Sequence, residues 1–143
     1  MATHMGGPVD WQCKREGRIS PSVCESEIKA MGAGHRMVMS LRNLFEDLDE
    51  QHIAEATPFL YCDNQGAVTW VHSESVNRQM RQFNIRQCGI REAVKFKEVL
   101  PVHIPGALNP ADLFTKEMCD VGHFQQLRSV LMSAETDDVD NTS

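Results

Sequence analysis

The sequence has no apolar run near the roughly 20 residues needed to cross a membrane, so we expect no membrane partner. Residues 1–7 contain neither the basic stretch nor the apolar stretch of a secretory signal, and we therefore expect an intracellular chain. Internal repeats are absent, which excludes a solenoid. The length of 143 residues allows one domain with a real core and excludes two of ordinary size.

Zinc and dinucleotide motifs are also missing. The five cysteines form no Cys-x-x-Cys pair, and the six histidines form no His-x-x-x-His pair, so we expect free thiols rather than disulfides or metal ligands. Gly32-Ala33-Gly34 is not a dinucleotide-binding loop, because Met37 stands where a third glycine is needed.

Positive charge is scarce overall but unevenly spread. The formal net charge of −6 argues against nucleic-acid binding by the whole surface. Residues 77–97 nevertheless hold six basic residues against one glutamate, whereas residues 46–55 and 135–140 are mostly acidic. The basic segment is either a phosphate-binding face or an ordinary solvated helix face, and the sequence leaves both open.

Hydrophobic periodicity predicts alternating strands and helices, which favours an α/β layered fold. We expect a flexible segment over residues 1–7, a folded domain over residues 8–132 and a disordered acidic tail over residues 133–143. The expected strands are residues 8–14, 59–62 and 99–104. The expected helices are residues 22–50, 65–71 and 78–97, one beginning at residue 109, and residues 124–132.

Two of these elements carry further expectations. The long helix has apolar residues at three- and four-residue spacing from Ile28 to Leu48, and Gly32 and Gly34 suggest close packing against a sheet. The wholly apolar strand 59–62 suits a position buried on both faces, and Pro101 suits an edge strand.

Acidic residues stand at the ends of three expected elements. Asp63 follows the strand 59–62, Asp112 lies at the start of a helix, and Glu25 and Glu27 lie at the head of the long helix. Carboxylates from separate elements can converge on hard cations such as Mg²⁺, which stabilise phosphodiester displacement. Alternatively, Asp63 is a turn residue and Asp112 a helix cap.

Several short words in the sequence resemble one known family. They are Val-Asp-Trp-Gln-Cys-Lys at 9–14, Ser-Val-Cys-Glu-Ser-Glu at 22–27, Cys-Asp-Asn-Gln at 62–65 and Ala-Asp-Leu-Phe-Thr-Lys at 111–116. In this order they resemble the ribonuclease H region of copia-type retrotransposon Pol polyproteins, from about residue 8 to residue 132.

The resemblance implies a ribonuclease H-like layered fold, a small mixed sheet flanked by helices. It also implies cutting of the RNA strand in RNA–DNA hybrids with Mg²⁺ or Mn²⁺. Glu25, Asp63 and Asp112 correspond to catalytic, metal-binding positions. Glu25 and Glu27 diverge by about 200° around the helix, so both cannot face one metal, and we choose Glu25. Arg78, Arg81 and Arg86 are expected to contact the phosphates of the hybrid.

One part of the family's pattern has no counterpart in this sequence. The first two strands, with an aspartate that normally bridges the metals, are absent, so the fold is expected to be N-terminally truncated and metal binding to be weaker. Asp10 is a low-ranking substitute ligand. The truncation exposes one edge of the strand 59–62, which the strand 8–14, a second copy of the chain or an N-terminal Pol segment would cover.

These expectations leave two functions open. The chain is a retroelement-derived ribonuclease H-like domain whose activity is impaired in isolation. Alternatively, it is an inactive, host-adopted or truncated module that serves in binding or oligomerisation.

Overall fold

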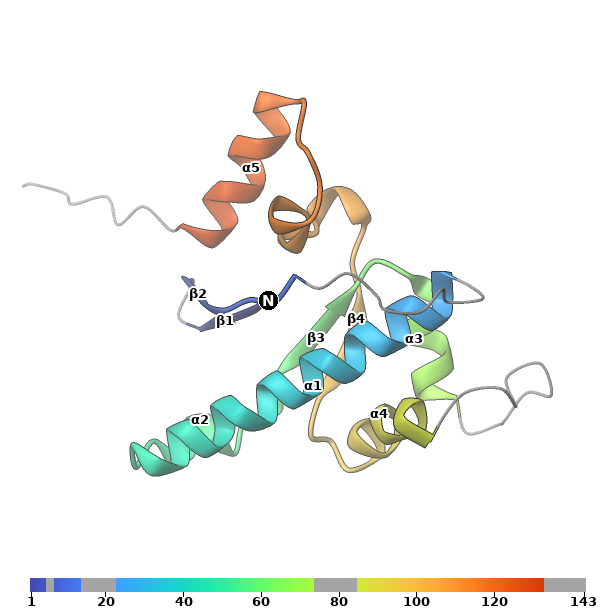
Figure 1. Ribbon diagram of the computed structural model, residues 1–143. Helices are drawn as coiled ribbons and strands as arrows, with labels where there is room; N and C mark the ends of the chain where they lie inside the picture. Colours follow the sequence, from blue (N-terminus) through green and yellow to red (C-terminus); the bar gives the residue numbers. More distant parts are fainter. Residues whose placement is uncertain (5–6, 14–22, 74–84, 133–143) are drawn as a thin grey trace, which may run out of the picture.

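The computed structural model describes residues 1–4, 7–13, 23–73 and 85–132, with the backbone alone for residues 85–88. This part of the chain is a mixed α/β structure with two small sheets (Figure 1). Its elements in chain order are β1 Ala2–His4, β2 Gly7–Asp10, α1 Val23–Asp47, α2 Gln51–Ala54, β3 Phe59–Cys62, α3 Gln65–His72, α4 Ile85–Lys95, β4 Leu100–His103, the 3₁₀ turns η2 Gly106–Leu108 and η3 Pro110–Phe114, and α5 Val121–Leu131.

Strands β3 and β4 form the central parallel pair. Phe59 is in register with Leu100, and Cys62 with His103, so both strands end at the same edge of the sheet. The backbone nitrogen of Leu100 donates to the carbonyl oxygen of Pro58, directly before β3, at 2.9 Å, and that of Ile104 donates to the carbonyl oxygen of Cys62 at 3.0 Å. The nitrogen of Pro101 therefore faces the opposite side, where no ladder bond is lost, as expected for an edge position.

One face of this sheet is packed against helices α1 and α3, and α4 packs against both of these helices. Leu60 and Cys62 point to that face, because side chains alternate along a strand. The core beneath them is built from buried side chains of β3, of helices α1, α3 and α4, and of Val99 directly before β4: Ile28, Met31, Cys62, Ala67, Val68, Trp70, Val71, Ile90, Ala93 and Val99.

The other face of the sheet is open. Phe59 and Tyr61 are 60% and 58% exposed, and their rings stack at 6.1 Å between centroids. Leu100, in register with Phe59, is 41% exposed. The expectation that residues 59–62 are buried on both faces was therefore wrong: within the described residues the helices that pack on the sheet lie on one face only.

Helix α1 is much longer than the sheet it covers. Its 25 residues span about 37 Å at 1.5 Å per residue, whereas a four-residue strand spans about 13 Å. Ile28 and Met31 are buried, but Leu44 and Leu48, on the same predicted stripe, are 50% and 60% exposed. The apolar spacing predicted the helix correctly, but only the first part of the apolar face is buried against the rest of the protein.

The N-terminal residues form a separate antiparallel hairpin, β1–β2. Ala2–His4 is a strand where the sequence led us to expect a flexible segment, and His4 packs against Phe45 at 5.1 Å. The expected strand 8–14 is realised as β2, which pairs with β1 and not with β3. Among the described residues, β3 is thus paired along one edge only.

The remaining elements follow the expected order. Helices α3, α4 and α5 form, although the part of α4 expected over residues 78–84 lies outside the described residues, as does the tail 133–143. Asn109–Pro110 begins the 3₁₀ turn η3 rather than an α-helix, and α5 packs on η3. None of the described helices is both long and apolar enough to cross a membrane.

Candidate metal centre

Asp63 lies at the carboxyl-terminal edge of the sheet, directly after β3. The loop after β4 approaches it, because a Cβ atom on Gly106 would stand 3.6 Å from Oδ2 of Asp63. The cap of helix α3 is the next residue, Asn64, whose Oδ1 accepts a hydrogen bond from the nitrogen of Ala67 at 3.0 Å. The capping role of this turn therefore belongs to Asn64, which leaves Asp63 for another role.

Asp112 sits inside η3 and is 8% exposed, the one buried charged side chain of the part of the chain described here. It is not a helix cap, because Asn109 precedes it and accepts from the nitrogen of Ala111 at 3.2 Å. Its Oδ2 accepts a hydrogen bond from Nζ of Lys116 at 2.7 Å. This hydrogen bond, with the nearby carboxylates of Asp112, Asp63 and Glu27, raises the pKa of Lys116.

Glu27 brings a third carboxylate to the same place from the head of α1. One ligand atom each of Glu27, Cys62 and Asp63 lie within 4.8 Å of one another. The pKa of Glu27 is raised, first by burial and then by the charge of Asp63, with a smaller contribution from Asp112. We call Glu27, Asp63 and Asp112 the acidic cluster. Asp112 is not one of the residues within 4.8 Å of one another, and it is included because its charge acts on Glu27 and because all three carboxylates attract Lys116.

Cys62 is the buried neighbour of Glu27 and Asp63. Its thiol is buried and donates to Oε2 of Glu27 at 3.8 Å, a long sulfur hydrogen bond. Burial raises the pKa of Cys62 to about 11, and the carboxylates of Glu27 and Asp63 add to this rise. Cys62 therefore stays a neutral thiol at physiological pH. The negative charge of the site comes from the neighbouring carboxylates, which attract cations.

The geometry favours Glu27 over the predicted Glu25 as the glutamate beside Asp63. Glu25 forms an ion pair with Lys29 at 3.0 Å, one turn further along α1. It is not part of the group made by Glu27, Cys62 and Asp63. The two glutamates do diverge around the helix, as the sequence required, but it is Glu27 that faces Asp63.

Of the other predicted site residues, Asp10 is the one whose side chain the structure describes. Asp10 is exposed and lines a hollow with Arg36 on α1, and no residue of the acidic cluster lines this hollow. Arg78 and Arg81 lie outside the described residues, and only the backbone of Arg86 is described. Their contact with nucleic acid stays a prediction.

The sequence interpretation missed two residues. Lys116 follows Asp112 by four positions, a spacing that brings side chains together on a helical turn, and this signal was available. Cys62 had no comparable signal, because a single cysteine in an apolar run is ordinarily a core residue.

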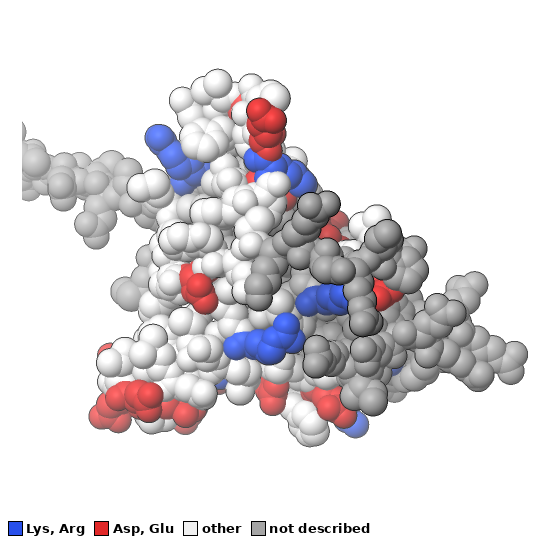
Figure 2. Space-filling model, in the orientation of Figure 1, with Lys and Arg blue, Asp and Glu red and all other residues white. Residues whose placement is uncertain are grey.

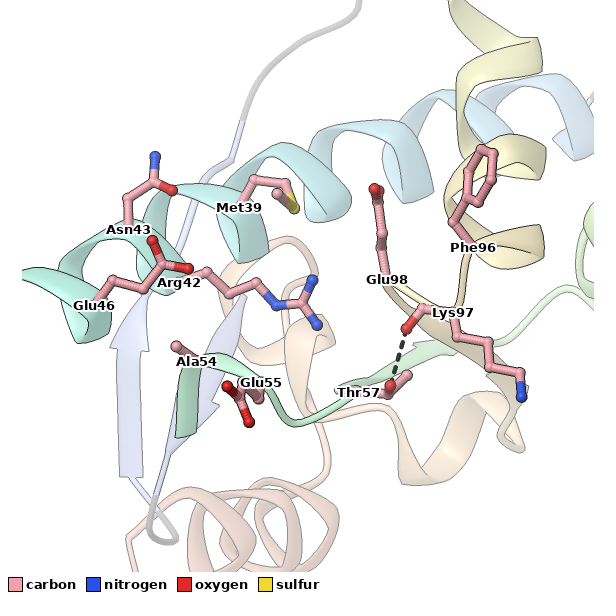
Figure 3. Close-up of a pocket in the computed structure, with 10 residues that line it drawn as sticks. All are labelled: Met39, Arg42, Asn43, Glu46, Ala54, Glu55, Thr57, Phe96, Lys97 and Glu98. Carbon is pink, nitrogen blue, oxygen red and sulfur yellow. Dashed lines mark hydrogen bonds between the residues drawn. The ribbon is translucent and has the colours of Figure 1, made fainter. Parts of the chain in front are cut away.

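A separate hollow lies among the described residues, away from the acidic cluster. It measures about 410 Å³ and is lined by charges of both signs, with Arg42 and Glu46 of α1 on one side and Lys97 and Glu98 on the other (Figure 3). It opens near Thr57 and Lys97, which precede β3 and β4, so it lies at the opposite end of the sheet from the acidic cluster. No residue of the acidic cluster lines it.

Acidic side chains also gather where no sheet edge organises them. On the face shown in Figure 2, they cover the end of the molecule that carries α2. These residues, including Glu46, Asp47 and Glu50, are exposed. They give the protein a second negative region that must be distinguished from the acidic cluster in any cation-binding experiment.

Comparison with known proteins links the chain to retroelements. It is similar to the Retrovirus-related Pol polyprotein from transposon TNT 1-94 of Nicotiana tabacum, at 29% identity over 115 residues. The matched region covers 80% of this chain but 8% of that polyprotein. No protein-family model matches the chain, and no solved structure matches it.

Proposed function

We propose that the chain is a ribonuclease H-like portion of a retroelement-derived Pol polyprotein and that the acidic cluster binds Mg²⁺ or Mn²⁺. One observation carries the proposal. The charges of Asp63, at the end of β3, and Asp112, in η3, both act on Glu27 of α1, and all three carboxylates attract Lys116, at the carboxyl edge of a parallel sheet. The similarity to a Pol polyprotein supports the same assignment.

The donor set fits a hard divalent cation. Mg²⁺ prefers carboxylate oxygens, and the cluster offers them from three elements. The raised pKa of Glu27 means that its charged form is disfavoured by burial and by Asp63, so a bound cation would relieve a cost that already exists. The neutral thiol of Cys62 adds no competing charge.

When bound, the metal ions would act as Lewis acids and lower the pKa of a coordinated water. The chain itself supplies position and charge. Asp63 is fixed by the end of β3, and Asp112 is held in a turn whose backbone is tied down by Asn109. Glu27 closes the site from the helix above. Arg78, Arg81 and Arg86 complete the proposal as contacts to the phosphates of an RNA–DNA hybrid.

Turnover by these 143 residues alone is proposed to be weak. The family's first-strand aspartate has no counterpart in them, and Asp10 is not among the residues that group with Glu27 and Asp63. Without that ligand, two metals would lose the carboxylate that they ordinarily share.

A second function is favoured by the open sheet. The exposed rings of Phe59 and Tyr61 and the edge of β3 would suit a binding or oligomerisation module that keeps the scaffold without cleaving nucleic acid. The two functions differ in what restores activity.

The experiment that separates them is cleavage of an RNA–DNA hybrid in Mg²⁺. The chain is assayed alone and joined to an N-terminal segment that carries the family's first two strands. We expect little cleavage by the chain alone, clear cleavage by the joined chain, and loss of that cleavage in Asp63→Asn. An inactive joined chain that binds hybrid would favour the binding module. Strong cleavage by the chain alone would show that the missing aspartate is dispensable and make Asp10 the next residue to mutate.

A further inference from the structure

Lys116 places a cation directly on the acidic cluster. Its Nζ lies 2.7 Å from Oδ2 of Asp112 and interacts favourably with Asp63 and Glu27 as well. The two side chains of this ion pair differ sharply in exposure: that of Lys116 is 60% exposed and that of Asp112 is 11% exposed. The pair thus joins a nearly buried anion to a cation that reaches it from solvent.

The buried carboxylate needs a counter-ion. A charged group removed from water without a partner is costly, and two further carboxylates close by increase the cost. The ammonium of Lys116 offsets part of this, since it attracts all three carboxylates of the cluster. In the metal-free protein, Lys116 therefore performs the electrostatic role that a divalent cation would perform.

The same position makes Lys116 a competitor. A hydrogen bond from Nζ to Oδ2 occupies an oxygen that a metal would use, and two cations at one site repel each other. Because the ammonium sits on a flexible and mostly exposed stem, it can swing into solvent at small cost. An arginine or lysine held rigidly in a buried position could not leave in this way.

We propose that Lys116 is a tethered counter-ion, which holds the acidic cluster together without metal and is displaced when a divalent cation binds. The proposal rests on the proposed function, because it assumes that the cluster is the metal site. It makes Lys116 a residue that sets metal affinity, through its effect on Asp112, without itself being a ligand.

The test is Mn²⁺ affinity, measured from the loss of the free Mn²⁺ signal in electron paramagnetic resonance, together with thermal unfolding of the metal-free protein. For Lys116→Met we expect roughly five-fold tighter Mn²⁺ binding, the size of effect expected when one ion pair is removed, and a lower metal-free unfolding temperature. Lys116→Gln should behave alike, and Lys116→Arg should stay near the wild type. Lys97→Met removes the same charge at the far end of the sheet and should change neither quantity beyond a small shift.

A counter-ion predicts that Lys116→Met raises Mn²⁺ affinity and lowers the unfolding temperature, and these opposite changes distinguish it from a merely structural lysine. A structural role predicts that Lys116→Met lowers both stability and Mn²⁺ affinity, and that result, or an unchanged affinity, overturns the proposal. The failure of the proposed function looks different. In that case Asp63→Asn does not weaken Mn²⁺ binding in either background. Absence of Mn²⁺ binding in the wild type and in both neutral variants would contradict both proposals.

Discussion

Glu27 carries a negative charge into a place that Asp63 and Asp112 already make negative. Its pKa is raised by burial and by these neighbours, so in the metal-free protein its ionised form is a cost rather than a contribution to stability. Such a cost is expected at functional sites, where an arrangement suited to a ligand is unfavourable without it.

Neutralising Glu27 should therefore stabilise the metal-free protein. For Glu27→Gln we expect a gain of up to about 1 kcal/mol in the free energy of unfolding, allowing for solvent screening of a half-exposed carboxylate. Glu25→Gln is the matched control. It removes an ion pair with Lys29 and a favourable charge in the first turn of α1, so it should be neutral or slightly destabilising. Urea denaturation without divalent cations measures both, and a loss of stability in Glu27→Gln would contradict the burial of that charge.

The gain in the free energy of unfolding of Glu27→Gln over wild type should increase as the pH rises. The pKa of Glu27 in the folded protein lies above its ordinary value of 4.5, so on raising the pH the unfolded chain loses this proton first. The contribution of Glu27 to stability is present below pH 4.5 and is lost as the pH rises through the folded pKa. The difference between Glu27→Gln and wild type should accordingly be smallest in acid, grow above pH 4.5 and then level off. A difference that shrinks with rising pH would reverse the sign and refute the assignment.

At the scale of elements, the rotation of α1 decides which glutamate faces the sheet. A Cβ atom on Gly34 would stand 2.9 Å from Cδ1 of Leu60, so Gly34 marks the side of α1 that touches β3. Glu27 precedes Gly34 by seven residues, about 20° short of two full turns, whereas Glu25 precedes it by nine and lies about half a turn away. Once Gly34 is known to face the strand, Glu27 follows.

The sequence predicts most of the elements around the acidic cluster, but it does not predict which glutamate of α1 faces the sheet. The positions of α1, β3, β4 and the acidic residues at their ends were predictable from periodicity and turn residues. Gly32 and Gly34 were both candidates for close packing, and each would have selected a different glutamate. Which glycine touches the sheet depends on the packing of α1 against Leu60, a long-range contact that local pattern does not encode. The exposed face of β3 was unpredictable for a related reason, because an apolar run does not say whether a second layer covers it.

The two glycines give an element-scale prediction. A Cβ atom on Gly32 would meet nothing closer than a guanidinium nitrogen of Arg36 at 3.9 Å. Gly32→Ala should therefore show the full helix-propensity gain of about 0.5–1 kcal/mol. Gly34→Ala should gain clearly less or lose stability, because Leu60 must move. The comparison is made by urea denaturation, and equal gains would show that α1 does not press on β3 at Gly34.

At the scale of the whole molecule, one face of the sheet and one edge of β3 are uncovered within the described residues. Phe59, Tyr61 and Leu100 form an exposed apolar face, and β3 has an unpaired edge beside it. The N-terminal hairpin does not pair with that edge. Unpaired edges with apolar side chains promote association with other chains.

We therefore expect the isolated chain to self-associate at micromolar concentration, with Phe59→Lys shifting it towards monomer. Phe96→Lys is a matched control, since Phe96 is 71% exposed but lies after α4, away from this face. Sedimentation velocity reports the distribution. Joining the chain to an N-terminal segment that pairs with the free edge of β3 should also give monomers. A wild-type chain that is monomeric at all concentrations would show that the face and edge are covered in solution.

The most direct test of the account is where a paramagnetic cation binds. Mn²⁺ added to isotopically labelled protein should broaden first the amide resonances of Glu27, Asp63 and Asp112, together with Cys62 and Gly106 beside them. Asp63→Asn should abolish this selective broadening, whereas Glu25→Gln should leave it intact. Broadening centred instead on the exposed acidic residues Glu46, Asp47 and Glu50, or broadening that persists in Asp63→Asn, would contradict the claim that the three carboxylates form one metal site.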